Sequence, residues 1–291
     1  MIAFNEAHER FVTHLSEKDR AESTIIAYKK DIQQLLSHIG DSTEKTHVHH
    51  INTDDVQSFL ATLDDQKYTK KSISRKLNSI KTFFRFLKLN DLIVDDPSSV
   101  ISHPKFDTPA PRILTKTEYR ALLDAAREDH RTYAIIELLL QTGIRIGELA
   151  QIQLADIDIN SENGSRTLHI PESRTTLERN IPLNKAAISA LSEYLEERVE
   201  TDSPHAFVTR TGKPLLVRNI RASIDRYYEK AGIDSAKVND LRHTWIAHHI
   251  KSGTSLITIS KMAGHRRLAT TEKYLEYVDL QNGAGVDLDE L

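Results

Sequence analysis

The sequence predicts a mainly α-helical protein of two domains, with one small β-sheet in the second domain. Three observations support this fold class. Apolar residues recur at helical spacing through the first hundred residues and again from residue 184 onward. Four prolines interrupt that periodicity between residues 95 and 114. Two short strand-like runs, TLHIP and RNIPL, flank the segment ESRTTLE, and this order is typical of a hairpin.

The N-terminal domain, residues 1–103, is expected to be built from helices. The segment 23–39 carries a helical stripe of apolar residues, with Ser23 as its candidate N-cap. The segment 52–66 repeats the stripe behind an Asn–Thr cap. A further helix is predicted over 69–90. Its apolar face would consist of Ile73, Leu77, Ile80, Phe84 and Leu87.

Positive charge is concentrated on that last helix. Residues 69–90 contain seven Lys or Arg and no acidic residue, although the whole chain has a net charge of −3. A run of charge is usually a solvated helix face, but the absence of any acid favours a face directed at DNA phosphates. The candidate DNA-binding residues are Lys70, Lys71, Arg75, Lys76, Lys81 and Arg85.

A proline-containing linker over 104–112 is expected to join this domain to a second one, residues 113–291, which ends in a C-terminal tail. Thr115 followed by Glu118 three residues later predicts a capping box at the start of the first helix of that domain. A second helix is predicted to follow it, up to about residue 142.

The composition excludes several classes of protein. The chain has no cysteine, which removes disulfides, thiol catalysis and cysteine–zinc sites and fits a cytoplasmic protein. No run of 18 apolar residues predicts a membrane span. The first residues lack the basic and apolar regions of a secretory signal, so none is expected.

Three stretches carry the residue types of phosphate chemistry. TGIRIGEL places Arg145 at a helix start after Gly143, NDLRHTWIAHHI contains Arg242, and GHRRLATTEKY contains His265 and Tyr274. Taken singly, each residue has an ordinary structural explanation, such as a surface arginine, a capping histidine or a packed tyrosine. A guanidinium, however, is always charged and binds phosphate through two parallel hydrogen bonds. Arg145, Arg242, His265 and Tyr274 are therefore candidates for phosphate chemistry.

These motifs resemble those of the tyrosine recombinases, the phage-integrase family, and of the Xer-type site-specific recombinases in particular. The spacing agrees, with 23 residues from Arg242 to His265 and nine from there to Tyr274. The resemblance implies an N-terminal SAM-like core-binding domain and a C-terminal mixed α/β catalytic domain. It assigns Tyr274 as the nucleophile that forms a 3′-phosphotyrosyl link. It assigns Arg145 and Arg242 to the phosphate oxygens, His265 to a hydrogen bond with phosphate, and no metal or other cofactor.

The sequence departs from this family at two positions. Asn239 stands three residues before Arg242, where the family usually has His or Lys, and Lys237 is the nearest charged substitute. Arg174 takes the place of the lysine in the hairpin, with Arg179 nearer the strand. Asparagine cannot transfer a proton, and arginine is a poor general acid. Either Arg174 acts electrostatically, or a lysine from elsewhere reaches the site, or the chemistry is slow.

The histidines of NDLRHTWIAHHI raise the alternative of a metal site. His243 and His248 are five residues apart, about 500° around a helix, which points them to different faces. A zinc site also usually has a carboxylate or cysteine partner. Both histidines are therefore expected to support the site structurally, and His249 has no assigned role.

The resemblance implies a partner as well as a reaction. The protein is expected to bind double-stranded DNA with inverted half-sites, as a dimer on each site and a tetramer in the synapse, and to exchange strands through a Holliday junction. The acidic tail VDLDEL either frays or docks on a neighbouring protomer. The length favours resolution of chromosome or plasmid dimers. The alternatives are a mobile-element integrase, a type IB topoisomerase-like enzyme and a DNA-binding regulator without turnover.

Overall fold

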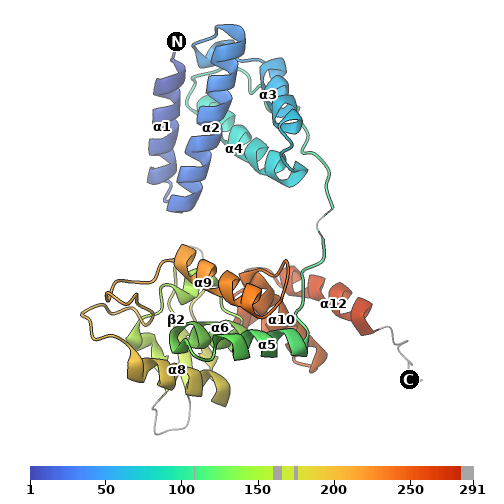
Figure 1. The fold of residues 1–291 in the computed structure, drawn as a ribbon. Coiled ribbons are helices and arrows are strands. Elements are labelled where there is room, and N and C mark those ends of the chain that lie inside the picture. The colour runs from blue at the N-terminus through green and yellow to red at the C-terminus, as the bar shows by residue number, and fades with distance from the viewer. Residues whose placement is uncertain (108, 160–165, 174–175, 283–291) are drawn as a thin grey trace. The chain divides into compact units, whose positions relative to one another are not determined.

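The computed structural model describes residues 1–107, 109–159, 166–173 and 176–282 (Figure 1). The chain divides into two compact units, Met1–Thr108 and Pro109–Leu291, and the boundary falls inside the predicted linker. Each unit has its own hydrophobic core. The mainly helical fold class is confirmed, and the second unit carries a three-stranded antiparallel sheet. In the ranges just given, no helix is long and apolar enough to cross a membrane.

The first unit packs four helices around one core. They are α1 (Phe4–Glu17), α2 (Glu22–Thr43), α3 (Thr53–Asp65) and α4 (Lys70–Leu89), with a short 3₁₀ turn at Val48–His50. The predicted apolar face of α4 is buried along its whole length. Phe11 of α1 meets Phe83 of α4 edge to face, with ring centroids 5.2 Å apart. The helical stripes read from the sequence therefore form the core of this unit.

The helix starts agree with the sequence in one case and differ in another. Asn52 accepts a hydrogen bond from the backbone N–H of Asp55 and donates its own backbone N–H to that carboxylate, so the predicted cap of α3 is confirmed. The prediction of Ser23 as N-cap is wrong. The first hydrogen bonds of α2 run to the carbonyl of Ala21, which leaves Ser23 inside the first turn.

One of the predicted DNA-binding cations is part of the core instead. Lys76 is 5% exposed, and its ammonium lies 2.8 Å from Asp31 Oδ1 and 2.5 Å from Gln34 Oε1. Arg75 donates to both oxygens of Asp31, at 2.7 and 2.9 Å, while its side chain stays 49% exposed. Burial by itself raises the pKa of Asp31, but the hydrogen bonds from Arg75 and Lys76 outweigh it and lower that pKa. The DNA-binding prediction is therefore corrected for Lys76, whose ammonium forms a buried ion pair with Asp31.

The other candidate cations of α4 differ in exposure. Lys70, Lys71 and Arg85 are exposed, and Lys81 is half-buried, with its ammonium 3.4 Å from the carbonyl of Ser99. The solvent face of α4 thus keeps a group of positive charges.

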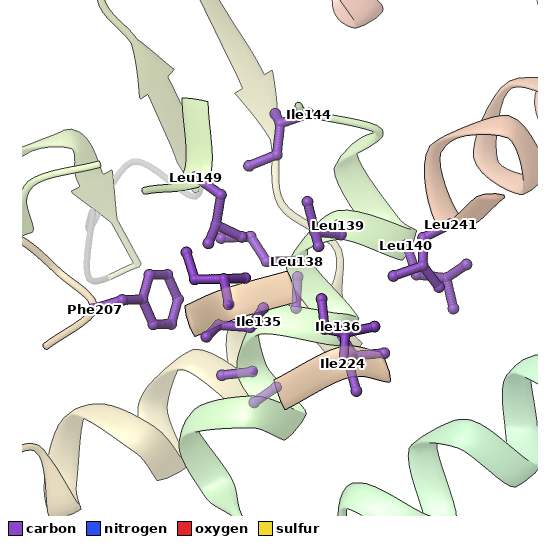
Figure 2. Close-up of a cluster of buried hydrophobic side chains, with 14 of the residues drawn as sticks. Ile135, Ile136, Leu138, Leu139, Leu140, Ile144, Leu149, Phe207, Ile224 and Leu241 are labelled. Carbon is purple, nitrogen blue, oxygen red and sulfur yellow. The ribbon is translucent and has the colours of Figure 1, made fainter. Parts of the chain in front are cut away.

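The second unit is built around α6 (Figure 2). Its helices are α5 (Lys116–Ala126), α6 (His130–Thr142), α7 (Ile146–Leu149), α8 (Lys185–Glu197), α9 (Val217–Lys230), α10 (Val238–Lys251), α11 (Leu256–Ala263) and α12 (Ala269–Asn282), with a 3₁₀ turn at Leu154–Asp156. Ile135, Leu138 and Leu139 of α6 are buried against neighbours that include Leu149 and Phe207. The predicted capping box of Thr115 and Glu118 is confirmed at the start of α5.

The sheet consists of β1 (Ile157–Asp158), β2 (Thr167–Ile170) and β3 (Arg179–Pro182), in that order and antiparallel. Leu168 pairs with Ile181, and both side chains are fully buried. The predicted hairpin is therefore present, and it places Arg179 at the first position of β3.

A separate apolar cluster joins α10, α11 and α12. Trp245, Ile259, Ala263 and Tyr274 are buried in it. Gly143 ends α6 with a φ of +63°, and a Cβ there would lie 2.4 Å from a ring carbon of Trp245. Only glycine combines this backbone conformation with so close an approach. The loop that carries Arg145 is thus pressed directly against α10.

Candidate active site

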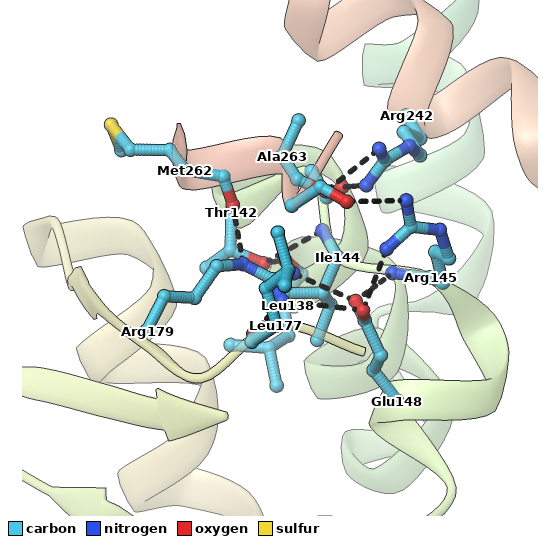
Figure 3. Close-up of polar contacts among 12 residues, drawn as sticks. Leu138, Thr142, Ile144, Arg145, Glu148, Leu177, Arg179, Arg242, Met262 and Ala263 are labelled. Carbon is cyan, nitrogen blue, oxygen red and sulfur yellow. Dashed lines mark hydrogen bonds and ion pairs between the residues drawn. The ribbon is translucent and has the colours of Figure 1, made fainter. Parts of the chain in front are cut away.

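Three arginines from three different elements converge on the C-terminal end of α11 (Figure 3). The bonds are Arg179 Nε to Met262 O at 2.7 Å, Arg242 Nη2 to Ala263 O at 2.8 Å, and Arg145 Nη2 to Gly264 O at 2.7 Å. The last carbonyls of a helix have no partner within it and carry the negative end of its dipole, so they attract cations. The three carbonyls that hold the guanidinium groups belong to the three residues that precede His265 in the sequence.

Glu148 joins two of these arginines. Its Oε1 lies 2.8 Å from Arg145 Nη1, and its Oε2 lies 2.8 Å from Arg179 Nη2. The carboxylate also accepts the backbone N–H of Arg145. Burial alone would raise the pKa of Glu148, but hydrogen bonds from Arg179 and from that N–H lower it overall. Glu148 is therefore ionised and fixes both guanidinium groups.

Replacing Glu148 with glutamine is expected to lower the free energy of unfolding of the second unit by about 3 kcal/mol at neutral pH, because it removes one partner of a buried ion pair. The pKa of Glu148 is lower in the folded protein than its ordinary value of 4.5. The stability that its ionised form contributes is therefore present above pH 4.5 and is lost as the pH falls through the folded-state pKa. The gap between wild type and E148Q should therefore narrow in acid. Urea unfolding at several pH values measures it. The exposed Glu196→Gln is the control, and an equal loss in both variants would contradict the prediction.

Arg242 is buried, with 7% of the whole residue exposed. Its Nη1 donates to the carbonyl of Gly143, in addition to the bond with Ala263. Burial, followed by the charge of Arg145, lowers the pKa of Arg242 from its ordinary value to about 10, so it remains protonated at neutral pH. Three arginines against one carboxylate leave this group with excess positive charge, which suits a phosphodiester.

His265 is held in its neutral form. Its Nδ1 lies 2.8 Å from the hydroxyl oxygen of Thr271. Burial, followed by the charges of Arg242 and Arg145, lowers its pKa from 6.5 to about 4. At neutral pH the imidazole of His265 can thus exchange hydrogen bonds with a phosphate oxygen, but it adds no charge.

Tyr274 lies on α12 with 8% exposure, and its hydroxyl is 2.6 Å from Nδ1 of His243. Tyr277, the neighbouring tyrosine, contacts the Tyr274 ring edge-on, at 6.2 Å between centroids. Burial raises the pKa of Tyr274, the charge of Arg242 acts against this, and the net shift is upward. The phenol is therefore protonated at neutral pH.

Asn239 and Arg174 are the two positions where the sequence departs from the recombinase pattern. Asn239 is exposed in the first turn of α10. Lys237 precedes that helix as its exposed N-cap, and its backbone N–H donates to Asp240 at 2.7 Å. Arg174 lies outside the described residues. Arg179, the other arginine of the hairpin, is not a solvent-accessible replacement for the lysine. Its side chain is only 7% exposed and is paired with Glu148.

Sequence reasoning missed two residues of the site, Glu148 and Gly264, and one contact, that of His243 with Tyr274. Glu148 follows Arg145 by three positions, a spacing at which a carboxylate caps a helix start, and this signal was available. Gly264 has a φ of +66°, and a Cβ there would lie 2.8 Å from Arg179 Nη1 and 3.3 Å from Arg145 Nη1. The contact of His243 with Tyr274 joins two helices and has no local signature.

A metal site receives no support from the part of the chain that the structure describes. There, no group of three or more His, Cys, Asp or Glu side chains is placed to hold a metal ion.

Comparison with known proteins covers both units. The sequence profile of the Phage integrase family matches residues 112–279, and that of the Phage integrase, N-terminal SAM-like domain matches residues 8–90. The tyrosine recombinase XerC of Alcanivorax borkumensis is 30% identical, covering 95% of this chain and 90% of that protein. The XerC of Roseiflexus sp. (strain RS-1) is 28% identical over 93% of this chain and 88% of that protein.

Solved structures with the same fold include two informative neighbours. A crystal structure of the XerA recombinase is 26% identical, with a TM-score of 0.54, and covers 97% of this chain and 100% of that one. A lambda integrase dimer bound to a COC′ core site has a TM-score of 0.77 at 17% identity, covering 99% of this chain and 80% of that one. The second likeness concerns the fold alone.

Proposed function

The chain belongs to the phage integrase family of tyrosine site-specific recombinases, enzymes that cut and rejoin DNA, and on this premise we propose that Tyr274 is its nucleophile. The phenol oxygen would attack the scissile phosphorus, form a 3′-phosphotyrosyl link and release a 5′-hydroxyl. Storing the bond energy in this covalent link allows the strand to be resealed without ATP.

The observation that carries this proposal is the convergence of Arg145, Arg242 and His265 at the end of α11, next to the helix of Tyr274. Fixed cations aimed at developing charge need no reorganisation during the reaction. The two carbonyl bonds of Arg242 and the bonds of Arg145 to Glu148 and Gly264 take two side-chain N–H groups from each guanidinium. A guanidinium has five, so donors remain for the non-bridging oxygens of a phosphate.

The leaving 5′-oxygen must be protonated, and this sequence has no lysine in the hairpin to do so. Arg179 is engaged with Glu148 and Met262, so we assign the role of the missing hairpin lysine to Arg174. An arginine at that position would stabilise the leaving oxygen through hydrogen bonds and charge, with water supplying the proton.

We further propose that the first unit binds DNA through the solvent face of α4. Lys70, Lys71 and Arg85 are exposed there, and Arg75 is oriented by Asp31 while half of its side chain stays in solvent. Phosphate contacts of this kind supply affinity without sequence information, so they fix the position of the duplex.

For assembly we propose a dimer on each DNA site and a tetramer in the synapse, joined through the C-terminal tail. The second unit has a cavity of about 850 Å³ between α5, α6 and α10. Its lining combines apolar side chains such as Leu140, Trp245 and Met262 with the basic Lys116 and Lys251. In the tail sequence VDLDEL, acidic and apolar residues alternate, so the tail complements a lining that is both apolar and basic.

The biological role that we propose is resolution of chromosome or plasmid dimers through a Holliday junction. The XerC recombinases named above match the chain over nearly its whole length, which supports this role. Integration of a mobile element is the alternative, since lambda integrase shares the fold.

The test is a suicide DNA substrate, nicked close to the scissile phosphate, that carries a site selected by binding. We expect wild-type protein to form a covalent complex whose tryptic adduct maps to the peptide of Tyr274. Arg174→Ala should slow its formation, and Arg174→Lys should restore it. Tight binding of the same DNA without any adduct would instead support a DNA-binding regulator without turnover.

A further inference from the structure

The hydroxyl of Tyr274 has a specific neighbour in His243. The distance from the hydroxyl oxygen to His243 Nδ1 is 2.6 Å, and the two ring centroids lie 5.8 Å apart. His243 directly follows Arg242 on α10, and α10 packs against α12, which carries the tyrosine. The same helix thus supplies one residue for the phosphate and another for the attacking oxygen.

The residue three positions before Arg242 cannot take the proton of the tyrosine. That residue is Asn239, whose amide has no basic nitrogen, and its side chain is exposed in the first turn of α10. Among the described residues, the hydrogen-bond partner of the Tyr274 hydroxyl is His243. The proton-accepting position next to the phenol is therefore occupied by an imidazole from one turn farther along the helix.

Both members of the pair are uncharged at neutral pH. Burial lowers the pKa of His243, Asp240 acts against that shift, and Arg242 adds to it, so the imidazole is neutral at neutral pH. The phenol is protonated, as described above, with Arg242 and Tyr277 as its charged and titratable neighbours. His265 is neutral as well. A protonated phenol beside a neutral imidazole is the pairing that general-base catalysis requires.

We propose that His243 is the general base for Tyr274, an inference that rests on the proposed nucleophile. As the phenol oxygen forms its bond to phosphorus, its proton moves to His243 Nδ1. The P–O5′ bond breaks, its electron pair stays on the 5′-oxygen, and that oxygen takes a proton from water. On rejoining, the 5′-hydroxyl gives its proton to water and attacks phosphorus. The departing phenol oxygen then recovers the proton from His243.

The test measures single-turnover cleavage of the suicide substrate at saturating protein. We expect His243→Ala and His243→Gln to slow cleavage about 100-fold without weakening DNA binding, since a positioned base contributes roughly 10²–10⁴-fold. His130→Gln is the matched control. His130 lies at the first residue of α6, and Gly143, which contacts the site, follows the other end of that helix, about 20 Å away. This control should cleave like wild type.

Three further readouts separate a base from a structural support. Free imidazole should accelerate H243A and leave wild type unchanged. As the pH is lowered, the wild-type rate should fall only below the ordinary range of histidine pKa values, because the pKa of His243 is lowered. H243Q should lose that pH dependence. A substrate with sulfur in place of the bridging 5′-oxygen needs no proton on its leaving group. It should therefore rescue R174A and leave the H243A defect in place.

Several outcomes would overturn the proposal. Wild-type rates in H243Q, with the adduct still on Tyr274, would exclude His243 as the base and leave the proposed function intact. Faster cleavage in H243A would show that the hydrogen bond restrains the nucleophile. Rescue of H243A by the sulfur substrate would assign its defect to the leaving group. An adduct absent from Tyr274 in wild type would instead reject the proposed function itself.

Discussion

Tyr274→Phe is expected to abolish the covalent DNA complex, with a loss of at least about 10⁴-fold in cleavage, while DNA binding stays at the wild-type level. The change removes one oxygen, and removal of an essential nucleophile costs on the order of 10⁶-fold in a well-studied hydrolase. The ring would keep its packing against Trp245, Ile259 and Ala263, so the fold should survive. Gel analysis of the suicide-substrate reaction, with binding measured by fluorescence anisotropy on the same DNA, gives both quantities.

The chain offers a close control in Tyr277, which lies one helical turn away and contacts the Tyr274 ring. Tyr277→Phe should form the covalent complex at nearly the wild-type rate. If Y277F were inactive and Y274F active, the nucleophile would have been assigned to the wrong tyrosine. If both variants cleaved, the enzyme would use a different nucleophile.

Arg242→Ala is expected to reduce cleavage by about 10³-fold, because removal of a fixed cation from a phosphoryl-transfer site costs roughly 10³–10⁵-fold. It should also destabilise the second unit, since the carbonyls of Gly143 and Ala263 lose their donor, and each unsatisfied buried group costs about 1–3 kcal/mol. Arg242→Lys keeps the charge but cannot reach both carbonyls, and it should recover only part of either loss. Single-turnover kinetics and urea unfolding measure the two effects separately.

The matched control is Arg127→Ala, an exposed arginine whose guanidinium lies over the ring of Tyr133 and donates to its hydroxyl. That variant should retain cleavage and most of its stability. Should R242A unfold no more easily than R127A, the carbonyl bonds would not be stabilising. Should R242A cleave like wild type, the phosphate would be bound by other groups.

Local patterns in the sequence were sufficient for several elements of this protein. The apolar stripe of α4, the capping boxes at Asn52 and Thr115, and the hairpin of β2 and β3 each depend on residues within a few positions of one another. Spacing also identified Arg145, Arg242, His265 and Tyr274 as one group, because a resemblance in order and distance along the chain does not require coordinates.

Contacts between distant segments were decided only by the tertiary structure. The charge run of α4 did not reveal that Lys76 would face Asp31, 45 residues away, because a cation has the same sequence pattern whether it meets solvent or a buried carboxylate. Glu148 and Arg179 are 31 residues apart, and His243 and Tyr274 are also 31 apart. Polar pairs of this kind form when packed helices and strands bring side chains together in a dry interior, where each must find a partner. Helical periodicity determines which face of an element is buried, but it does not specify which residue lies opposite.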